Sequence, residues 1–248
     1  MVNINLNVIN SCVSTNEIAF NAALNGAKEG NSYLSYNQTK GRGRNSNEWI
    51  SIKGNLFLST IIRPNKKKSY WNQLSIIVGF SALEVFCELG VDKNIIEMKW
   101  PNDILVDKKK ISGILLESSD NFIVAGIGAN ILKNPTKEKK WDTARLIDYI
   151  NFTASIEDIG LKILDKVFNN YIVWENFGLK AFINKVNPFI KNINCMICVK
   201  LSSQSDYING IFLGLGDNGG LKIKQNEEVL EFYSIDNFYF PERNSILF

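Results

Sequence analysis

The sequence predicts an α+β fold, in which a mixed or antiparallel sheet is flanked by helices and followed by a small β-rich domain. Short apolar segments between residues 95 and 131 follow one another with only brief turns, which favours such a sheet over a doubly wound parallel one. Two longer segments, 71–89 and 155–181, carry apolar residues at helical spacing. After Pro188 the chain changes to short strands with glycine-containing turns. The predicted domains are therefore 1–188 and 189–248.

Seven strands are predicted in the first domain from apolar runs bounded by turn residues. They span 4–9, 32–37, 55–62, 95–100, 104–106, 111–117 and 122–131. Asp107, Lys108 and Lys109 form a polar hairpin turn between two of them.

A first helix is predicted from about residue 15 to 28. Ser14 and Glu17 have the spacing of a capping box at its start, and Gly30 provides a stop. Gly90 similarly ends the helix at 71–89. The polar segments 38–47 and 134–140 are predicted to be loops.

Composition excludes several classes of function. With 45% hydrophobic residues in 248, the chain can bury a sizeable core, and its net charge of +3 is too small for a dedicated nucleic-acid binder. The chain has no histidine, which excludes Ser-His and Cys-His catalytic pairs and any zinc site that uses histidine. Proton transfer and charge stabilisation must therefore come from other groups.

The four cysteines are too scattered for a disulfide framework. Cys195 and Cys198 have a spacing found in redox and metal sites, but they lie in an apolar run that resembles a strand. A separation of three residues places two side chains on opposite faces of a strand. We therefore expect a structural role for this pair. No signal peptide or membrane-spanning segment is predicted, which indicates a cytoplasmic protein without a membrane partner.

The loop from Gln38 to Arg44 combines Gly41 and Gly43 with three cations. Glycines let the backbone approach a ligand, unpaired N–H groups in such a loop can surround an anion, and arginine can bond a carboxylate or phosphate through two N–H groups. The alternatives are a solvated basic loop or a nucleic-acid contact. The pattern is not a Walker loop, because no Gly-Lys-Ser/Thr follows.

The segment from Lys99 to Asp103 reads Lys-Trp-Pro-Asn-Asp. Its proline interrupts a strand and exposes the amide and carboxylate that follow. Asp103 is a candidate Mg²⁺ ligand near a triphosphate, because Mg²⁺ prefers oxygen donors. The alternative is an ordinary turn in which Asn and Asp have their usual place. Lys110 leads directly into an apolar strand, so it is the lysine of its run most expected to face a site.

In their order along the chain, these motifs resemble the biotin protein ligase family, of the type without an N-terminal DNA-binding domain. The resemblance spans almost the whole chain, including Lys110-Ile-Ser-Gly-Ile-Leu115 and Gly126-Ile-Gly-Ala-Asn130. It implies a class II synthetase-like catalytic fold with a small C-terminal SH3-like barrel. It also implies a monomer or weak homodimer that does not bind DNA.

The resemblance also implies the site residues. The expected biotin-binding residues are Ser14, Thr15, Asn16, Gln38, Gly41, Arg42, Lys110, Gly113, Leu115 and Gly126, with the Ser-Thr-Asn run on the ureido ring. The expected ATP-binding residues are Arg44, Trp49, Asn102, Lys110 and Asn130. The expected catalytic residues are Arg42, Arg44, Lys110 and Asp103, with Asp103 also the tentative Mg²⁺ ligand.

The implied reaction has two steps. Biotin and Mg-ATP give biotinyl-5′-AMP and pyrophosphate, and the biotinyl group then passes to a lysine of a biotin carboxyl carrier protein or of a carboxylase's biotin-acceptor domain. One departure from the family pattern is the segment 45–48, Asn-Ser-Asn-Glu, where the family often has further Gly and Arg. Fewer cations there would weaken retention of the adenylate.

Two other functions compete with this one. A lipoate or octanoate protein ligase shares the fold and the adenylation chemistry, and the Gly-Arg-Gly-Arg and Lys-Trp-Pro-Asn-Asp motifs favour biotin over it. A nucleic-acid-binding module is suggested by the cations at 40–44 and 66–68 and by the small β domain. Such a module would bind with a steep dependence on salt.

Overall fold

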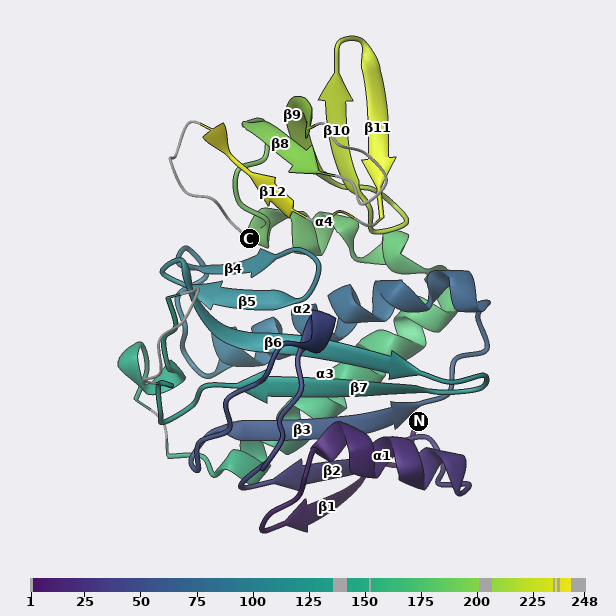
Figure 1. The fold of residues 1–248 in the computed structure, drawn as a ribbon, viewed down its shortest axis with the longest axis vertical. Coiled ribbons are helices and arrows are strands. Elements are labelled where there is room, and N and C mark those ends of the chain that lie inside the picture. Colours follow the sequence, from purple (N-terminus) through teal and green to yellow (C-terminus); the bar gives the residue numbers. More distant parts are fainter. Residues whose placement is uncertain are drawn as a thin grey trace. The chain divides into compact units, whose positions relative to one another are not determined.

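The computed structural model describes residues 2–135, 142–151, 153–200, 207–233, 235 and 237–241. The chain forms two compact units, Met1–Asn176 and Phe177–Phe248. The first unit is built on a seven-stranded mixed sheet with the order β1-β2-β3-β7-β6-β5-β4 (Figure 1). Only β1 and β2 are parallel to each other. The α+β class predicted from the sequence is confirmed.

All seven strands predicted for the first unit are present, with bounds within a few residues of those expected. They are β1 (Asn5–Ile9), β2 (Asn31–Ser35), β3 (Leu56–Ile62), β4 (Ile96–Lys99), β5 (Asp103–Val106), β6 (Lys109–Ser118) and β7 (Ile123–Ala129). Asp107 and Lys108 adopt positive φ angles of 50° and 62° in the tight turn between β5 and β6.

The two faces of this sheet have different coverings (Figure 1). The helix α1 (Thr15–Leu24) packs on one face, where Ala19 and Ala23 form a core cluster with Ile61 and Val124. The helices α2 (Leu74–Glu88) and α3 (Ile156–Phe177) pack on the other. On that side a Cβ at Gly160 of α3 would lie 3.1 Å from Leu34 Cδ1. The α1 face is covered only in part, which leaves β5, β6 and half of β7 available for a site.

The helix α1 is shorter than predicted. It ends at Leu24 because Gly26, with φ at 89°, begins a Schellman motif. In that motif Gly26 N–H donates to Ala23 O at 3.2 Å and Ala27 N–H donates to Ala22 O at 2.9 Å. The predicted capping box is wrong, since Ser14 makes no side-chain cap hydrogen bond.

The two long helices differ slightly from the expected 71–89 and 155–181. A 3-10 helix, η2 (Lys68–Gln73), precedes α2, and α3 stops before Gly178, whose φ of 72° favours glycine. A further 3-10 turn, η3 (Leu146–Asp148), follows β7. The predicted loop at 134–140 lies mostly outside the described residues.

The second unit is rich in β-structure, as predicted. Its sheet has the antiparallel order β11-β10-β9-β8-β12. The strands are β8 (Met196–Lys200), β9 (Tyr207–Leu215), β10 (Leu221–Gln225), β11 (Glu228–Phe232) and β12 (Asn237–Tyr239). They follow η4 (Leu179–Ala181), α4 (Ile183–Val186) and η5 (Asn187–Phe189). The likeness to an SH3-like barrel stays a prediction.

The boundary between the units falls earlier than the predicted position at Pro188. Asn187 accordingly lies in the second unit, where its Oδ1 accepts a hydrogen bond from Leu215 N–H at 3.1 Å. All four cysteines are free thiols, and Cys198 is buried in β8. Across the described part of the chain, no helix combines the length and the apolar character needed to cross a membrane.

The packing of β3 on α3 generates a stability prediction. Leu58 is fully buried, and a Cβ at Gly160 would lie 3.9 Å from its Cδ2 atom. We expect Leu58→Ala to lower the free energy of unfolding by about 2–5 kcal/mol, because it leaves a cavity between sheet and helix. All five tryptophans precede residue 177, so tryptophan fluorescence in urea reports the first unit alone.

The matched control is Leu24→Ala on α1, where the side chain is 60% exposed. Its effect should stay within about 0.5 kcal/mol. A similar loss in both variants would contradict the assignment of Leu58 to the core.

Candidate functional site

The part of the sheet face that α1 leaves open is covered by the loop between β2 and β3. In Figure 1 this segment crosses in front of the sheet. Its Trp49 indole lies against the backbone of β6 and β7, where Gly113 pairs with Gly128. A Cβ at Gly128 would come within 2.5 Å of Trp49 Cε2, and one at Gly113 within 3.1 Å of Trp49 Cζ3. The two glycines therefore form the floor on which the loop rests.

The loop folds back on itself as a small hairpin. Trp49 N–H donates to Gly41 O at 3.0 Å, and Gly43 N–H donates to Asn47 O at 2.7 Å. At its tip η1 (Arg44–Ser46) contains Asn45 with φ at 53°. Any side chain at Gly41 would clash with the carbonyl of Trp49. The predicted loop is therefore present, with a short 3-10 turn that the sequence analysis missed.

Gln38 joins the loop to the start of α1. Its Oε1 accepts a hydrogen bond from Thr15 N–H at 2.8 Å and lies 3.2 Å from Thr15 Oγ1. Its Nε2 donates to Ser51 Oγ at 3.1 Å. Ser14 is buried at the first turn of the helix beside Thr15. The sequence-predicted polar residues of helix and loop are thus in contact.

Asn16 points from α1 toward the sheet and is buried. Its Oδ1 accepts a hydrogen bond from Ser59 Oγ at 2.6 Å, and its Nδ2 donates to Glu117 Oε2 at 2.7 Å. A side chain at Gly126 would clash with the Asn16 amide. Leu115 pairs with Gly126 across β6 and β7, so it shares this face.

Glu117 was not among the predicted site residues. Its Oε2 also accepts a hydrogen bond from Arg42 Nη2 at 3.0 Å, which forms an ion pair between β6 and the loop. The signal was the strand period of two: Glu117 follows Gly113 and Leu115 at alternate positions, so all three face the same side. Gly113 and Leu115 were predicted site residues, and Glu117 has the same place in the next repeat of this pattern.

Lys110 and Asp103 form an ion pair of 2.7 Å between Nζ and Oδ1, with about a fifth of each side chain exposed. Lys110 Nζ also lies 5.4 Å from the centre of the Trp49 ring. Lys99 pairs with Asp103 across β4 and β5. Burial lowers the pKa of Lys99, and the positive charge of Lys110 lowers it further, although the Asp103 carboxylate opposes this shift. Two lysines thus surround one carboxylate.

Arg44 reaches a different point of the sheet from Arg42. Its Nη1 donates to Asn102 Oδ1 at 3.0 Å, while Asn102 Nδ2 donates to Ile114 O at 3.0 Å. Ile114 and Glu117 are three residues apart, which is about 10 Å along a strand. The predicted cations Arg42, Arg44 and Lys110 therefore surround the loop site, and each has its own partner.

Among the described residues, three buried polar atoms at the site have no hydrogen-bond partner: Trp49 Nε1, Asn130 Oδ1 and Asp103 Oδ1, the last of which has the ion pair with Lys110. Asn130 directly follows β7, and its Nδ2 donates to Ala144 O at 3.2 Å, while Ala144 N–H donates to Lys110 O at 3.0 Å. An oxygen held rigidly beside Lys110 is suited to a cation or a nucleotide hydroxyl.

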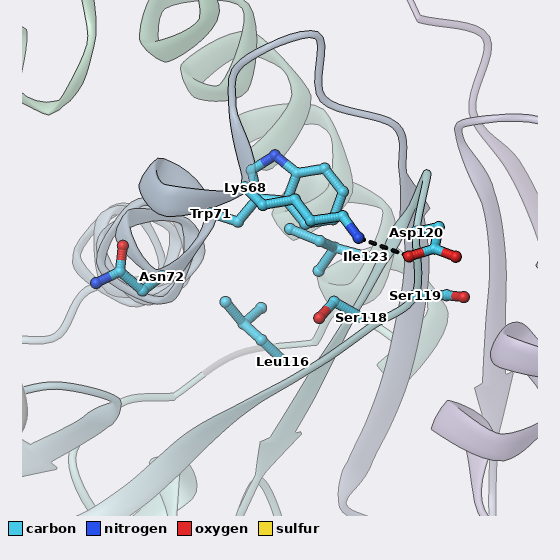
Figure 2. A pocket seen from close by; sticks show the side chains of 8 residues that line it. All are labelled: Lys68, Trp71, Asn72, Leu116, Ser118, Ser119, Asp120 and Ile123. Carbon is cyan, nitrogen blue, oxygen red and sulfur yellow. Dashed lines mark hydrogen bonds and ion pairs between the residues drawn. The ribbon is translucent and has the colours of Figure 1, made fainter.

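A separate cavity of about 430 Å³ lies on the α2 side of β6, away from the loop (Figure 2). It contains none of the predicted site residues. Its lining includes Trp71, Leu116 and Ile123, and at its mouth Lys68 Nζ contacts Asp120 Oδ1 at 2.7 Å. The chemistry indicated by the motifs is on the opposite face of the sheet.

The glycine floor generates a second prediction. Gly128→Ala should push the Trp49 ring away from the sheet, because the added methyl group occupies the position of its ring atoms. We expect acrylamide to quench Trp49 more strongly in this variant. The contribution of Trp49 is obtained by subtracting the same measurement on the matching Trp49→Phe protein. Gly43→Ala is the control, because its nearest contact, Asn47 O at 3.3 Å, asks for a shift of only a few tenths of an ångström. Equal quenching in all backgrounds would contradict the stacking of Trp49 on the floor.

Comparisons with known proteins agree with this architecture. Residues 8–134 match the family described as the biotin/lipoate A/B protein ligase family. The chain is 28% identical over 250 residues to the bifunctional ligase/repressor BirA of Bacillus subtilis, covering 90% of this chain and 70% of that protein. It is 30% identical over 175 residues to the biotin–[acetyl-CoA-carboxylase] ligase of Mycobacterium tuberculosis, covering 69% and 65%.

Among solved structures, the biotin protein ligase from Aquifex aeolicus in complex with biotin and ATP superposes with a TM-score of 0.78. The identity is 26%, and the match covers 95% of this chain and 99% of that one. The resemblance inferred from the motifs is confirmed. A family match over residues 8–134, together with a shared fold along nearly the whole chain, shows that this protein belongs to the biotin/lipoate A/B protein ligase family.

Proposed function

We propose that this protein is an ATP-dependent biotin–protein ligase, which activates biotin as biotinyl-5′-AMP and transfers it to a lysine of an acceptor protein. The observation that carries the proposal is the loop over the glycine floor, with Lys110 and Asp103 paired beside it. The same fold holds biotin and ATP in the Aquifex aeolicus ligase named above. The catalytic residues in this proposal are Arg42, Arg44, Lys110 and Asp103.

The biotin end of the site is formed by uncharged polar groups at the start of α1. Thr15, Asn16 and Gln38 offer donors and acceptors that suit a ureido ring, and Ser14 lies beside them. Gly113 and Gly126 let the Trp49 ring and the Asn16 amide lie close to the strands, and Leu115 adds an apolar side chain on the same face. Gly41 lets the loop backbone approach, and Arg42 and Lys110 are the cations available to the biotin carboxylate.

The nucleotide end lies toward β5. Arg44 and Asn102 are already hydrogen-bonded to each other, and the Trp49 indole supplies an apolar surface with an N–H donor that has no partner. Asn130 adds an oxygen that also has none. Lys110 contacts both the loop and the carboxylate of Asp103, so it lies between the two ends of the site.

The donors present fit Mg²⁺, which prefers oxygen and commonly takes one or two carboxylates with substrate phosphates. Asp103 would supply a carboxylate oxygen and Asn130 Oδ1 an amide oxygen. When bound with ATP, the ion neutralises phosphate charge. No cluster of three or more His, Cys, Asp or Glu side chains able to hold a metal occurs in the described residues, consistent with an ion held mainly by the nucleotide.

In the first step, a biotin carboxylate oxygen attacks the α-phosphorus of ATP and the bond to pyrophosphate breaks. Both reactants are anions, so the main requirement is to position them and to stabilise the added negative charge. Lys110 and the two loop arginines can each provide this, and one well-placed donor contributes about 3 kcal/mol to such a transition state. No histidine is required.

In the second step, a neutral acceptor lysine attacks the carbonyl carbon of the adenylate, AMP leaves, and the amine loses a proton to solvent. We propose a biotin carboxyl carrier protein or a carboxylase's biotin-acceptor domain as the acceptor. The support is the name of the Mycobacterium tuberculosis relative, a biotin–[acetyl-CoA-carboxylase] ligase. Lipoate or octanoate is the alternative acid, because the matched family includes lipoate ligases.

The first test is biotin-dependent release of pyrophosphate from Mg-ATP, run beside lipoate and octanoate. We expect release with biotin alone. Lys110→Ala should reduce the rate about 100-fold or more, since it removes the central cation. Lys108→Ala, in the exposed turn before β6, is the matched control and should retain full activity. Release with lipoate instead would assign the protein to the other branch of the family, and no release with any acid would contradict the ligase activity.

A second test concerns retention of the intermediate. Arg44 fastens the tip of the loop to Asn102, so Arg44→Gly should let the loop open before the acceptor arrives. We expect biotinylation of lysines on unrelated proteins mixed with this variant, detected with labelled streptavidin. Lys68→Gly is the control, because Lys68 pairs with Asp120 at the cavity on the opposite side of the sheet. Acceptor-specific labelling in both variants would contradict a retaining role for Arg44.

A further inference from the structure

Glu117 connects two segments that are far apart in the sequence. Its Oε2 atom accepts a hydrogen bond from Asn16 Nδ2 at 2.7 Å and another from Arg42 Nη2 at 3.0 Å. An ionised carboxylate only accepts hydrogen bonds, so both donors use its charge. A single oxygen of β6 therefore holds the first helix and the loop at the same time.

The Asn16 side of this junction is rigid. Asn16 is 3% exposed, and its Oδ1 is held by Ser59 at 2.6 Å. Because a carboxylate cannot donate, the amide nitrogen must face Glu117, which fixes the orientation of the amide. Gly126 leaves the space that the amide occupies. The Glu117 carboxylate is thus positioned from the α1 side, independently of the loop.

The Arg42 side of the junction can open. The side chains of Arg42 and Glu117 are 41% and 28% exposed, and an ion pair so close to water is weak by itself. Arg42 lies between Gly41 and Gly43, whose backbone hydrogen bonds to Trp49 and Asn47 close the loop hairpin. The Arg42 guanidinium therefore attaches the hairpin to β6, in addition to the Arg44 bond to Asn102 and the Trp49 ring on the glycine floor, and releasing it removes that attachment.

We propose that Glu117 is a positioning residue that latches the loop over the reaction intermediate, an inference that rests on the proposed function. Asn16 holds the Glu117 carboxylate in place, and Arg42 is the partner that can move away from it. Loss of the latch lets biotinyl-5′-adenylate escape or meet water before the acceptor lysine arrives. Glu117 contacts Arg42 and Asn16 and not the reacting atoms, so its loss is expected to change adenylate escape more than adenylate formation.

Glu117→Gln tests this proposal with little change in shape. Its side-chain carbonyl can still accept from Asn16, while the ion pair with Arg42 is lost. Escape of adenylate from the isolated protein–adenylate complex should become about three- to tenfold faster, the range expected when one partly exposed, charge-assisted hydrogen bond is lost. The first-turnover rate of biotin-dependent pyrophosphate release, measured on the same protein, separates a change in adenylate formation from the change in escape; slower formation with unchanged escape would overturn the latch.

Two further variants make the test specific. Asp120→Asn removes a more exposed ion pair, the one with Lys68 at the cavity of Figure 2, and should leave adenylate escape unchanged. Arg42→Gln opens the same latch from the loop side. If Glu117 acts through Arg42, the double variant Glu117→Gln/Arg42→Gln releases adenylate no faster than Arg42→Gln alone.

Unchanged escape in Glu117→Gln, or additive effects in the double variant, would overturn the latch and leave the ligase activity standing. Hydrogen exchange in the ligand-free proteins decides the same question without any catalysis. The Gly43 and Trp49 amides should exchange faster in Glu117→Gln and Arg42→Gln than in the wild type or Asp120→Asn. Equal exchange would overturn the latch, whereas absent biotin-dependent pyrophosphate release in the wild type would count only against the proposed function.

Discussion

Three glycines on one face of the central sheet leave its backbone uncovered, and the site is built on that surface. Gly113 and Gly128 are paired neighbours that support the Trp49 ring, and Gly126 leaves space for the Asn16 amide. Any side chain at Gly126 or Gly128 would displace the group above it. The hydrogen bonds between Gln38 and Thr15 and between Arg44 and Asn102 require the loop to lie this close to the sheet.

The charges of the site are already paired within the protein. Arg42 is held by Glu117 and Lys110 by Asp103, so an incoming carboxylate or phosphate must exchange with a resident carboxylate or share its cation. Both ion pairs are partly exposed to water, so exchanging one partner for another costs little free energy. Burial lowers the pKa of Lys99, and the Asp103 carboxylate opposes this shift more than the Lys110 charge adds to it.

Sequence reasoning identified the strands well because each is a short apolar run with turn residues at its ends. It placed the end of α1 too late, since Gly26 ended the helix before Gly30 could. It also placed the domain boundary at a proline, where the Asn187 side chain already belongs to the second sheet. At both positions the turn-forming residues allow more than one end point. The hydrogen bond from Gly26 to Ala23 ends the helix, and the one from Leu215 to Asn187 places Asn187 in the second unit.

The sequence by itself determined the α+β class, the order of the strands along the chain and the motifs that identify the family. These depend on residue type and spacing, which are local properties. Only the tertiary structure decided which residues meet: Asn16, Arg42 and Glu117 share one junction although they are up to 101 residues apart. It also separated Arg42 from Arg44, which are two residues apart in the loop but bond to Glu117 on β6 and to Asn102 in the turn before β5. The physical reason is that strand register and the depth of the glycine floor set these distances, and neither can be read from a linear motif.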